Sequence, residues 1–165
     1  MRLARNITLA IGATIALPGL CAATGENSQP FSITISSTQR TVQTGHEIRV
    51  RVVLTNVSNQ DLPLRLSRNP LEAEMHYTVS VHDETGRGAA ETKYGSTARK
   101  HQVIGLSEAA TLLKPGEQLE EYAILTNLFD LTSPGDYEVQ LSRPVSTDEK
   151  DGVVKSNKIT ITVTE

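Results

Sequence analysis

The strongest constraint on the fold of this chain is a two-residue alternation of apolar and polar side chains that recurs in segment after segment. Residues 31–36 read FSITIS, and residues 47–56 read EIRVRVVLTN with the same rhythm. Successive side chains of a β-strand point to opposite faces, so this rhythm is typical of a strand with one buried face. Shorter versions predict strands at residues 62–67, 75–84, 117–126, 136–143 and 157–165.

The alternation also predicts which side chains face the core. No segment shows a convincing amphipathic helical period, so the sequence predicts an all-β chain. Strands with one polar face are best buried as two packed sheets, which predicts an immunoglobulin-like antiparallel β-sandwich of about seven strands. The expected inward side chains are Phe31, Ile33, Ile35, Ile48, Val50, Val52, Leu54, Tyr77, Val79, Val81, Leu119, Tyr122, Ile124, Tyr137, Val139, Leu141, Ile159, Ile161 and Val163.

The first 23 residues have the three-part layout of a secretory signal peptide. Two arginines precede an apolar run at residues 7–17, and Cys21-Ala22-Ala23 supplies small residues for cleavage. The apolar run is too short to span a bilayer comfortably. We therefore expect an exported protein, periplasmic or extracellular, that is cleaved near Ala23. The alternative is a lipoprotein anchored at Cys21.

Cleavage would leave a flexible polar leader at residues 24–30 and one domain at residues 31–165. Cys21 is the only cysteine, so the mature domain would have no disulfide, and its stability would come from packing and hydrogen bonds. The chain has a net charge of −3, which argues against a general nucleic-acid-binding function. No second apolar stretch reaches membrane length, and we expect a monomer.

A sharp corner precedes the strand at residues 136–143. The sequence Ser133-Pro134-Gly135 is followed two residues later by Tyr137. Immunoglobulin-type sandwiches often place a tyrosine at such a corner, where its hydroxyl bonds to the backbone a few residues upstream. We therefore expect Gly135 and Tyr137 to be structural.

Residues 113–143 also support a resemblance to known families. Their sequence, LKPGEQLEEYAILTNLFDLTSPGDYEVQLSR, resembles the immunoglobulin-like domain attached to deuterolysin-type zinc endopeptidases. It is similar, too, to the corner of BsuPI-type proteinase inhibitor domains. The resemblance implies a small secreted bacterial protein of immunoglobulin-like fold, and it implies no ligand.

The motifs of catalysis and metal binding are incomplete. His46-Glu47 lacks the second histidine of a zinc peptidase motif, and Val50 occupies the position three residues after Glu47. His76 and His82 are too far apart along a strand, roughly 20 Å, to share one metal. The acidic stretch at residues 146–152 lacks the spacing of a calcium-binding EF-hand loop. We expect no catalytic residue, no metal site and no cofactor.

The connection at residues 84–116 is longer than a compact sandwich requires. Long connections are often functional, and this one contains a local basic patch with one aromatic residue. The competing interpretation is a solvated loop with one extra short strand at residues 101–106. Candidate contact residues for an acidic protein or glycan are Arg87, Lys93, Tyr94, Arg99, Lys100 and His101.

The sequence therefore predicts an exported, non-catalytic binding or interaction domain of unknown ligand. Two alternatives stay open, a proteinase inhibitor that presents a loop to a protease, and an enzyme of unrecognised type. Asn56-Val57-Ser58 is a glycosylation sequon only in a eukaryotic host, whereas the resemblance above implies a bacterial one.

Overall fold

The computed structural model describes residues 29–67, 76–101, 108–146 and 152–165. The predicted signal peptide and most of the predicted leader lie outside these residues. No helix of this described part is long and apolar enough to cross a membrane. The elements are β1 (Phe31–Ser36), β2 (Thr41–Gln43), β3 (Arg49–Asn56), β4 (Leu62–Ser67), β5 (Thr78–Asp83), α1 (Lys93–His101), β6 (Glu108–Leu113), β7 (Gln118–Ile124), α2 (Leu125–Leu128), β8 (Gly135–Pro144), β9 (Val153–Lys155) and β10 (Ile159–Thr164).

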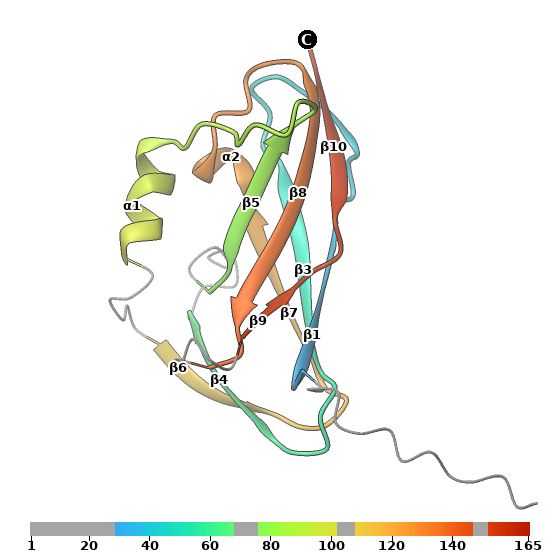
Figure 1. Cartoon of the computed structure of the whole chain (residues 1–165), viewed down its shortest axis with the longest axis vertical. Helices are drawn as coiled ribbons and strands as arrows, with labels where there is room; N and C mark the ends of the chain where they lie inside the picture. Colours follow the sequence, from blue (N-terminus) through green and yellow to red (C-terminus); the bar gives the residue numbers. More distant parts are fainter. Residues whose placement is uncertain (1–28, 68–75, 102–107, 147–151) are drawn as a thin grey trace, which may run out of the picture.

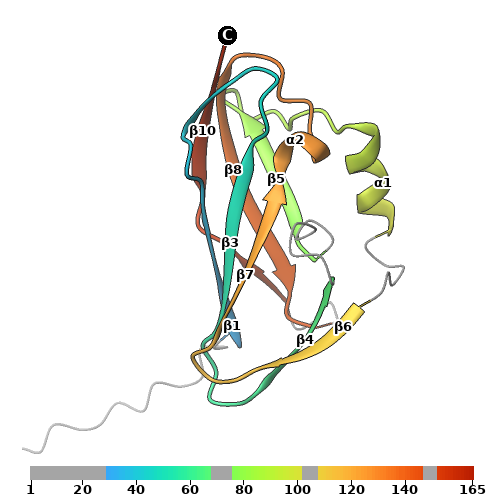
Figure 2. The same cartoon turned by 180° about the vertical axis from the view of Figure 1, so that it is seen from behind.

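The strands form two main sheets that pack face to face (Figure 1 and Figure 2). One sheet has the order β1-β3-β7, and the other has the order β2-β10-β8-β5 with β9 beside β8; β4 and β6 form a separate two-stranded sheet. The pairs are antiparallel except for the short parallel pair of β2 and β10. The predicted all-β, immunoglobulin-like sandwich is confirmed. The described residues form ten strands, more than expected, because the three-residue strands β2 and β9 are too short to show alternation and β6, with the sequence EAATLL, does not alternate.

One hydrophobic cluster joins the inner faces of the two sheets, and the predicted alternation is confirmed in most strands. The inward residues of β1 and β3 and those of β5, β8 and β10 belong to this cluster, with Ile159 only partly buried. Covering these faces removes apolar surface from water, which is the main stabilising contribution to a fold of this kind.

The prediction for β7 is wrong for two of its three inward residues. Tyr122 pairs with Arg51, and Ile124 pairs with Arg49, so both lie on the outer face of the sheet. Glu121 and Ala123 are buried instead. Leu119, on the same face as these two, is partly buried against the core as predicted.

The long connection at residues 84–116 contains regular structure in its described residues, 84–101 and 108–116. Its first residues return along β5, with the N–H of Ala89 donating to the carbonyl oxygen of Val81 at 2.9 Å. The helix α1 and the strand β6 follow, and the short strand considered at residues 101–106 lies, apart from His101 at the end of α1, outside the described residues. Thr92 caps α1, because its Oγ1 accepts a 2.9 Å hydrogen bond from the N–H of Gly95. The described part of this connection thus contains a short helix that the apolar pattern of the sequence did not indicate.

The helix α1 packs against α2 through small residues. Gly95 and Ala98 are buried, and a Cβ at Gly95 would lie 2.1 Å from the carbonyl oxygen of Leu128. Only glycine permits so close an approach of the two backbones. The absence of large apolar residues on the buried side of α1 explains why the sequence shows no amphipathic pattern.

We predict that Gly95→Ala destabilises the protein, although alanine favours helices by about 1 kcal/mol over glycine. The added methyl group would overlap the backbone of Leu128, which cannot move as a flexible side chain would. The expected loss is about 1–3 kcal/mol, as for other overpacked sites, measured by urea denaturation.

The matched control is Gly88→Ala, because a Cβ at Gly88 meets nothing within 4 Å. An unchanged unfolding midpoint for Gly95→Ala would contradict the close packing of α1 on α2.

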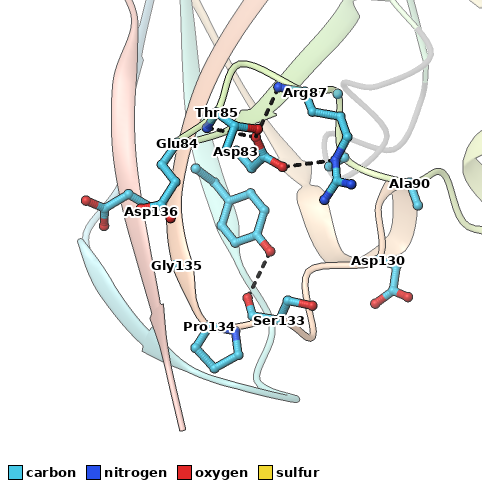
Figure 3. A pocket seen from close by; sticks show the side chains of 13 residues that line it. Asp83, Glu84, Thr85, Arg87, Ala90, Asp130, Ser133, Pro134, Gly135 and Asp136 are labelled. Atoms are coloured by element: carbon cyan, nitrogen blue, oxygen red, sulfur yellow. Dashed lines mark hydrogen bonds and ion pairs between the residues drawn. The ribbon is translucent and has the colours of Figure 1, made fainter.

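The corner before β8 has the geometry expected of a tyrosine corner (Figure 3). The hydroxyl of Tyr137 donates a 2.8 Å hydrogen bond to the carbonyl oxygen of Ser133, four residues upstream. Gly135 has a φ of +150°, which a residue with a side chain rarely adopts. The buried ring of Tyr137 thus fixes the turn through which the chain enters β8.

We predict that Tyr137→Phe lowers stability by about 1–3 kcal/mol, because the carbonyl of Ser133 loses its hydrogen-bond donor while the ring is kept. Chemical denaturation should show a lower midpoint with an unchanged slope. Tyr122→Phe is the control, since its hydroxyl bonds to the exposed Glu120 on the outer face, and its midpoint should stay close to that of the parent.

Candidate functional site

A surface hollow of about 590 Å³ lies beside the tyrosine corner (Figure 3). We call it the corner hollow. One wall is the turn that follows β5, and the other wall is the segment that leads into β8. Its charged lining residues are Asp83, Glu84, Arg87, Asp130 and Asp136.

Asp83 organises the turn that forms the first wall. Its Oδ1 accepts hydrogen bonds from the N–H and the hydroxyl of Thr85, at 2.9 and 2.5 Å, and from the N–H of Arg87 at 3.0 Å. Its Oδ2 accepts a 3.2 Å hydrogen bond from Nε of Arg87. These bonds, the hydroxyl of Thr85 foremost, hold the pKa of Asp83 below its ordinary value. Asp83 is thus a charged turn-forming group.

Asp130, Asp136 and Tyr137 of the corner hollow also have structural partners. Asp130 accepts hydrogen bonds from the N–H and the hydroxyl of Thr132, at 3.2 and 2.7 Å. Asp136 accepts a 2.6 Å hydrogen bond from the hydroxyl of Thr162. Burial, together with the charges of Asp83 and Asp130, raises the pKa of Tyr137, which keeps its phenol protonated. Asp130 stabilises a turn, Asp136 links β8 to β10, and Tyr137 fixes the corner. No two of these groups form a pair of an acid and a base.

No group of three or more histidine, cysteine, aspartate or glutamate side chains in the described residues could hold a metal ion. His46 lines a second hollow of about 600 Å³, which shares Ala90 and Asp130 with the corner hollow.

The predicted contact residues lie on two different elements. Arg87 lies on the turn beside the corner hollow, where it pairs with Asp83. Lys93 and Tyr94 lie in the first turn of α1, and the side chain of Tyr94 is 48% exposed. The other three candidates, Arg99, Lys100 and His101, form the end of α1. Their side chains lie outside the described part of the structure. Their contact role stays a prediction.

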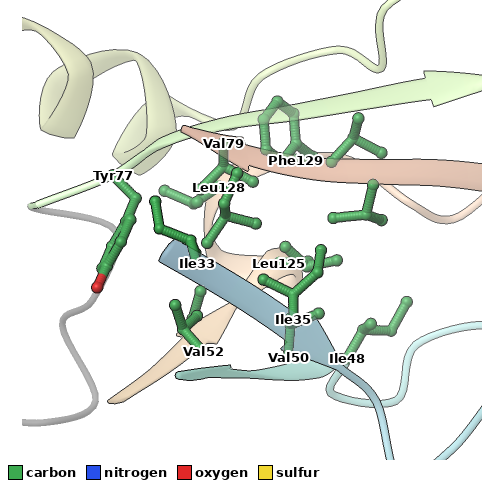
Figure 4. Packing of buried hydrophobic residues seen from close by; sticks show 14 of the residues in the cluster. Ile33, Ile35, Ile48, Val50, Val52, Tyr77, Val79, Leu125, Leu128 and Phe129 are labelled. Atoms are coloured by element: carbon green, nitrogen blue, oxygen red, sulfur yellow. The ribbon is translucent and has the colours of Figure 1, made fainter. Parts of the chain in front are cut away.

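A buried polar cluster that the sequence pattern did not indicate lies between the sheets. Glu121 of β7 is only 3% exposed, and its Oε2 accepts a 3.0 Å hydrogen bond from the hydroxyl of Tyr77. The guanidinium of Arg143 lies over the ring of Tyr77, 5.5 Å from its centre. Tyr77 lies at one end of the hydrophobic cluster, with its hydroxyl turned away from the aliphatic side chains (Figure 4).

Burial raises the pKa of Glu121, and the Tyr77 hydrogen bond and the Arg143 charge oppose that rise. Burial also raises the pKa of Tyr77, so its phenol stays protonated and can donate to Glu121. The run Glu120-Glu121-Tyr122 gave no clear signal for this cluster, and Glu121 faces inward because it pairs with the inward residue Val52 of β3.

We predict that Glu121→Gln stabilises the protein increasingly as the pH rises above 4.5, the ordinary pKa of a glutamate. Because the folded pKa is raised, the contribution of Glu121 to stability is complete below that value. It is lost as the pH rises through the folded pKa, where a buried charge must form. Glutamine stays neutral and can still accept the Tyr77 hydrogen bond, so urea midpoints from pH 4 to 8 should diverge from those of the parent.

The control is Glu120→Gln at the neighbouring position, because the contribution of Glu120 to stability depends on pH in the opposite direction. Hydrogen bonds from Arg51 and Tyr122 lower the pKa of Glu120 to about 2, so its contribution is present above 4.5 and is lost as the pH falls towards 2. Equal pH profiles for parent and Glu121→Gln would show that Glu121 is solvated.

Asn56, the first residue of the sequon, is unavailable to a glycosylating enzyme in the folded protein. It is 1% exposed, and its Nδ2 donates to the carbonyl oxygens of Gln60 and Leu113, at 2.8 and 2.7 Å. The side chain therefore connects the end of β3 to the end of β6.

Comparisons with known proteins assign no family to this chain. No protein-family model matches it, and no curated protein matches it. Hence no family match supports the resemblance of residues 113–143 to the deuterolysin-associated or BsuPI-type domains.

Among solved structures, the chain is similar to a β-glucosidase from Listeria innocua in complex with isofagomine, at 17% identity and a TM-score of 0.44. The match covers 81% of this chain and only 16% of the β-glucosidase chain. The CARDB domain of a Pyrococcus furiosus protein in complex with di-metal ions matches at 12% identity and a TM-score of 0.40, over 81% of this chain and 87% of that chain.

An alkylpurine DNA glycosylase from Pseudomonas fluorescens bound to DNA matches at 14% identity and a TM-score of 0.43, over 81% of this chain and 30% of that chain. Similarities at this level assign no activity and no ligand. The chain is therefore characterised by its own architecture, a β-sandwich with a tyrosine corner and an added helix.

Proposed function

We propose that this chain is an exported, non-catalytic binding domain that contacts an acidic partner, a protein or a glycan, through the helix α1. Export is supported by the three-part layout of the first 23 residues. A non-catalytic role is supported by the corner hollow, where Asp83, Asp130 and Asp136 each accept hydrogen bonds from residues of the fold.

The observation on which the proposal rests is the fixed position of a basic helix on an acidic chain. The sequence of α1, KYGSTARKH, contains no acidic residue, whereas the whole chain has a net charge of −3. The contact between Gly95 and Leu128 fixes the helix against the sandwich. A preformed basic surface loses little conformational entropy on binding and attracts an acidic partner at long range.

A proteinase inhibitor is the second candidate function, and one observation favours it. The side chain of Arg87 is 84% exposed on a turn that Asp83 fixes by hydrogen bonds. Trypsin-like proteases accept such a side chain in their specificity pocket. Assays of trypsin inhibition by the purified protein separate this candidate from a binding domain that uses α1.

We predict that the double variant Lys93→Glu, Lys100→Glu weakens partner binding by at least about tenfold at low salt, which corresponds to about 1.4 kcal/mol. The partner would first be identified by affinity capture from the exported proteins of the host. Its dissociation constant would then be measured with the purified partner at low and high ionic strength. Binding by the parent should weaken with salt, and binding by the variant should depend on salt less.

The control is Lys114→Glu, Lys155→Glu, which changes the net charge equally at exposed positions outside α1. If both double variants weaken binding to the same extent, net charge and not the helix determines the affinity, and the proposal fails.

A further inference from the structure

A hollow of about 420 Å³ lies where β1 of one sheet meets β10 of the other, away from α1. We call it the seam hollow. Its polar lining includes the cations Arg40 and Lys158 and the hydroxyls of Ser36 and Thr160, and no carboxylate lines it. By contrast, four carboxylates and one arginine line the corner hollow. The charged residues that line the seam hollow are thus positive, whereas the chain as a whole has a net negative charge.

Hydrogen bonds fix the frame of the seam hollow. The side chain of Asn157 makes two hydrogen bonds to the backbone of Ile35 in β1. Its Oδ1 accepts a hydrogen bond from the N–H of Ile35 at 2.8 Å, and its Nδ2 donates one to the carbonyl oxygen of Ile35 at 3.0 Å. The carbonyl oxygen of Arg40 accepts a 2.7 Å hydrogen bond from the N–H of Thr162 in β10. The backbones that present the cations and hydroxyls are therefore anchored to both sheets.

Several donors in the seam hollow are available to a ligand. Within the described part of the chain, the side chains of Arg40, Ser36 and Thr160 make no hydrogen bond or ion pair. Lys158 pairs with Glu138 at 2.7 Å, but both side chains are about half exposed, and such pairs contribute little. Lys158 can therefore turn towards a second anion at small cost.

We propose that the seam hollow binds a tetrahedral oxyanion, the sulfate or phosphate group of an ester. The planar guanidinium of Arg40 can donate two parallel hydrogen bonds to two oxygens of such a group. The hydroxyls of Ser36 and Thr160 can donate to further oxygens, and Lys158 adds a positive charge. This site is independent of the partner contact proposed for α1.

The test is an NMR titration of the ¹⁵N-labelled protein with sodium sulfate and, separately, with sodium phosphate, at ionic strength held constant with sodium chloride. We expect saturable shifts of the amide signals of Arg40, Lys158 and Thr160, with a dissociation constant in the millimolar range, which is about 4 kcal/mol of binding free energy. Glucosamine 6-sulfate and glucose 6-phosphate then distinguish the two ester sources, since the natural class should bind at least about tenfold more tightly than its inorganic ion.

Arg40→Gln should weaken the binding of the preferred ion at least about tenfold, because a charge-assisted bidentate contact is lost. The control Lys114→Gln removes an exposed positive charge outside the seam hollow and should leave the affinity unchanged. Shifts that grow linearly without saturation, or that persist equally in Arg40→Gln, would identify an adventitious ion only and would overturn the proposal. The ¹⁵N spectrum of each variant shows directly whether it is folded.

Discussion

Hydrophobic contact between the inner faces of the two sheets holds this molecule together, and the other features depend on it. The only cysteine precedes the described residues, so no disulfide is available to the sandwich. Each sheet has one apolar face, and neither sheet would be stable with that face in water. Once the faces are joined, the corner at Tyr137 fixes the entry into β8, and α2 at the end of β7 supplies the surface on which α1 packs.

Glu121 is a buried ionisable side chain beside the otherwise apolar contact between the two sheets. Burial of an ionised carboxylate is costly, and the hydrogen bond from Tyr77 and the charge of Arg143 offset part of the cost. An apolar residue of similar size would be compatible with the same strand pairing. The cluster therefore stabilises the fold less than the side chains around it do, and it makes the stability sensitive to pH.

Charge is distributed unevenly over the surface, and this distribution guides the functional proposals. Near the tyrosine corner, Asp83 and Asp130 accept hydrogen bonds that shape turns, and Asp136 accepts one from Thr162 of the neighbouring strand β10, so these three carboxylates are engaged in structure. Two positively charged features stand out within the described residues, the helix α1 on one side of the sandwich and the seam hollow between β1 and β10. Both rest on rigid frames, through Gly95 in α1 and through Asn157 at the seam. These are the two features to which we assign the proposed contacts with anionic groups.

The sequence alone determined the sandwich, the inward faces of β1, β3, β5, β8 and β10, and the place of the corner tyrosine, because alternation and turn chemistry are local properties of neighbouring residues. The tertiary structure decided the inward face of β7, where the run Glu120-Glu121-Tyr122 is ambiguous and only the pairing with β3 selects Glu121. It also decided that α1 is a helix, since its stability comes from a contact between Gly95 and Leu128 and not from an apolar stripe. The seam hollow was hidden for a related reason. Arg40 and Lys158 are far apart along the chain, and the parallel pairing of β2 with β10 brings them to one surface.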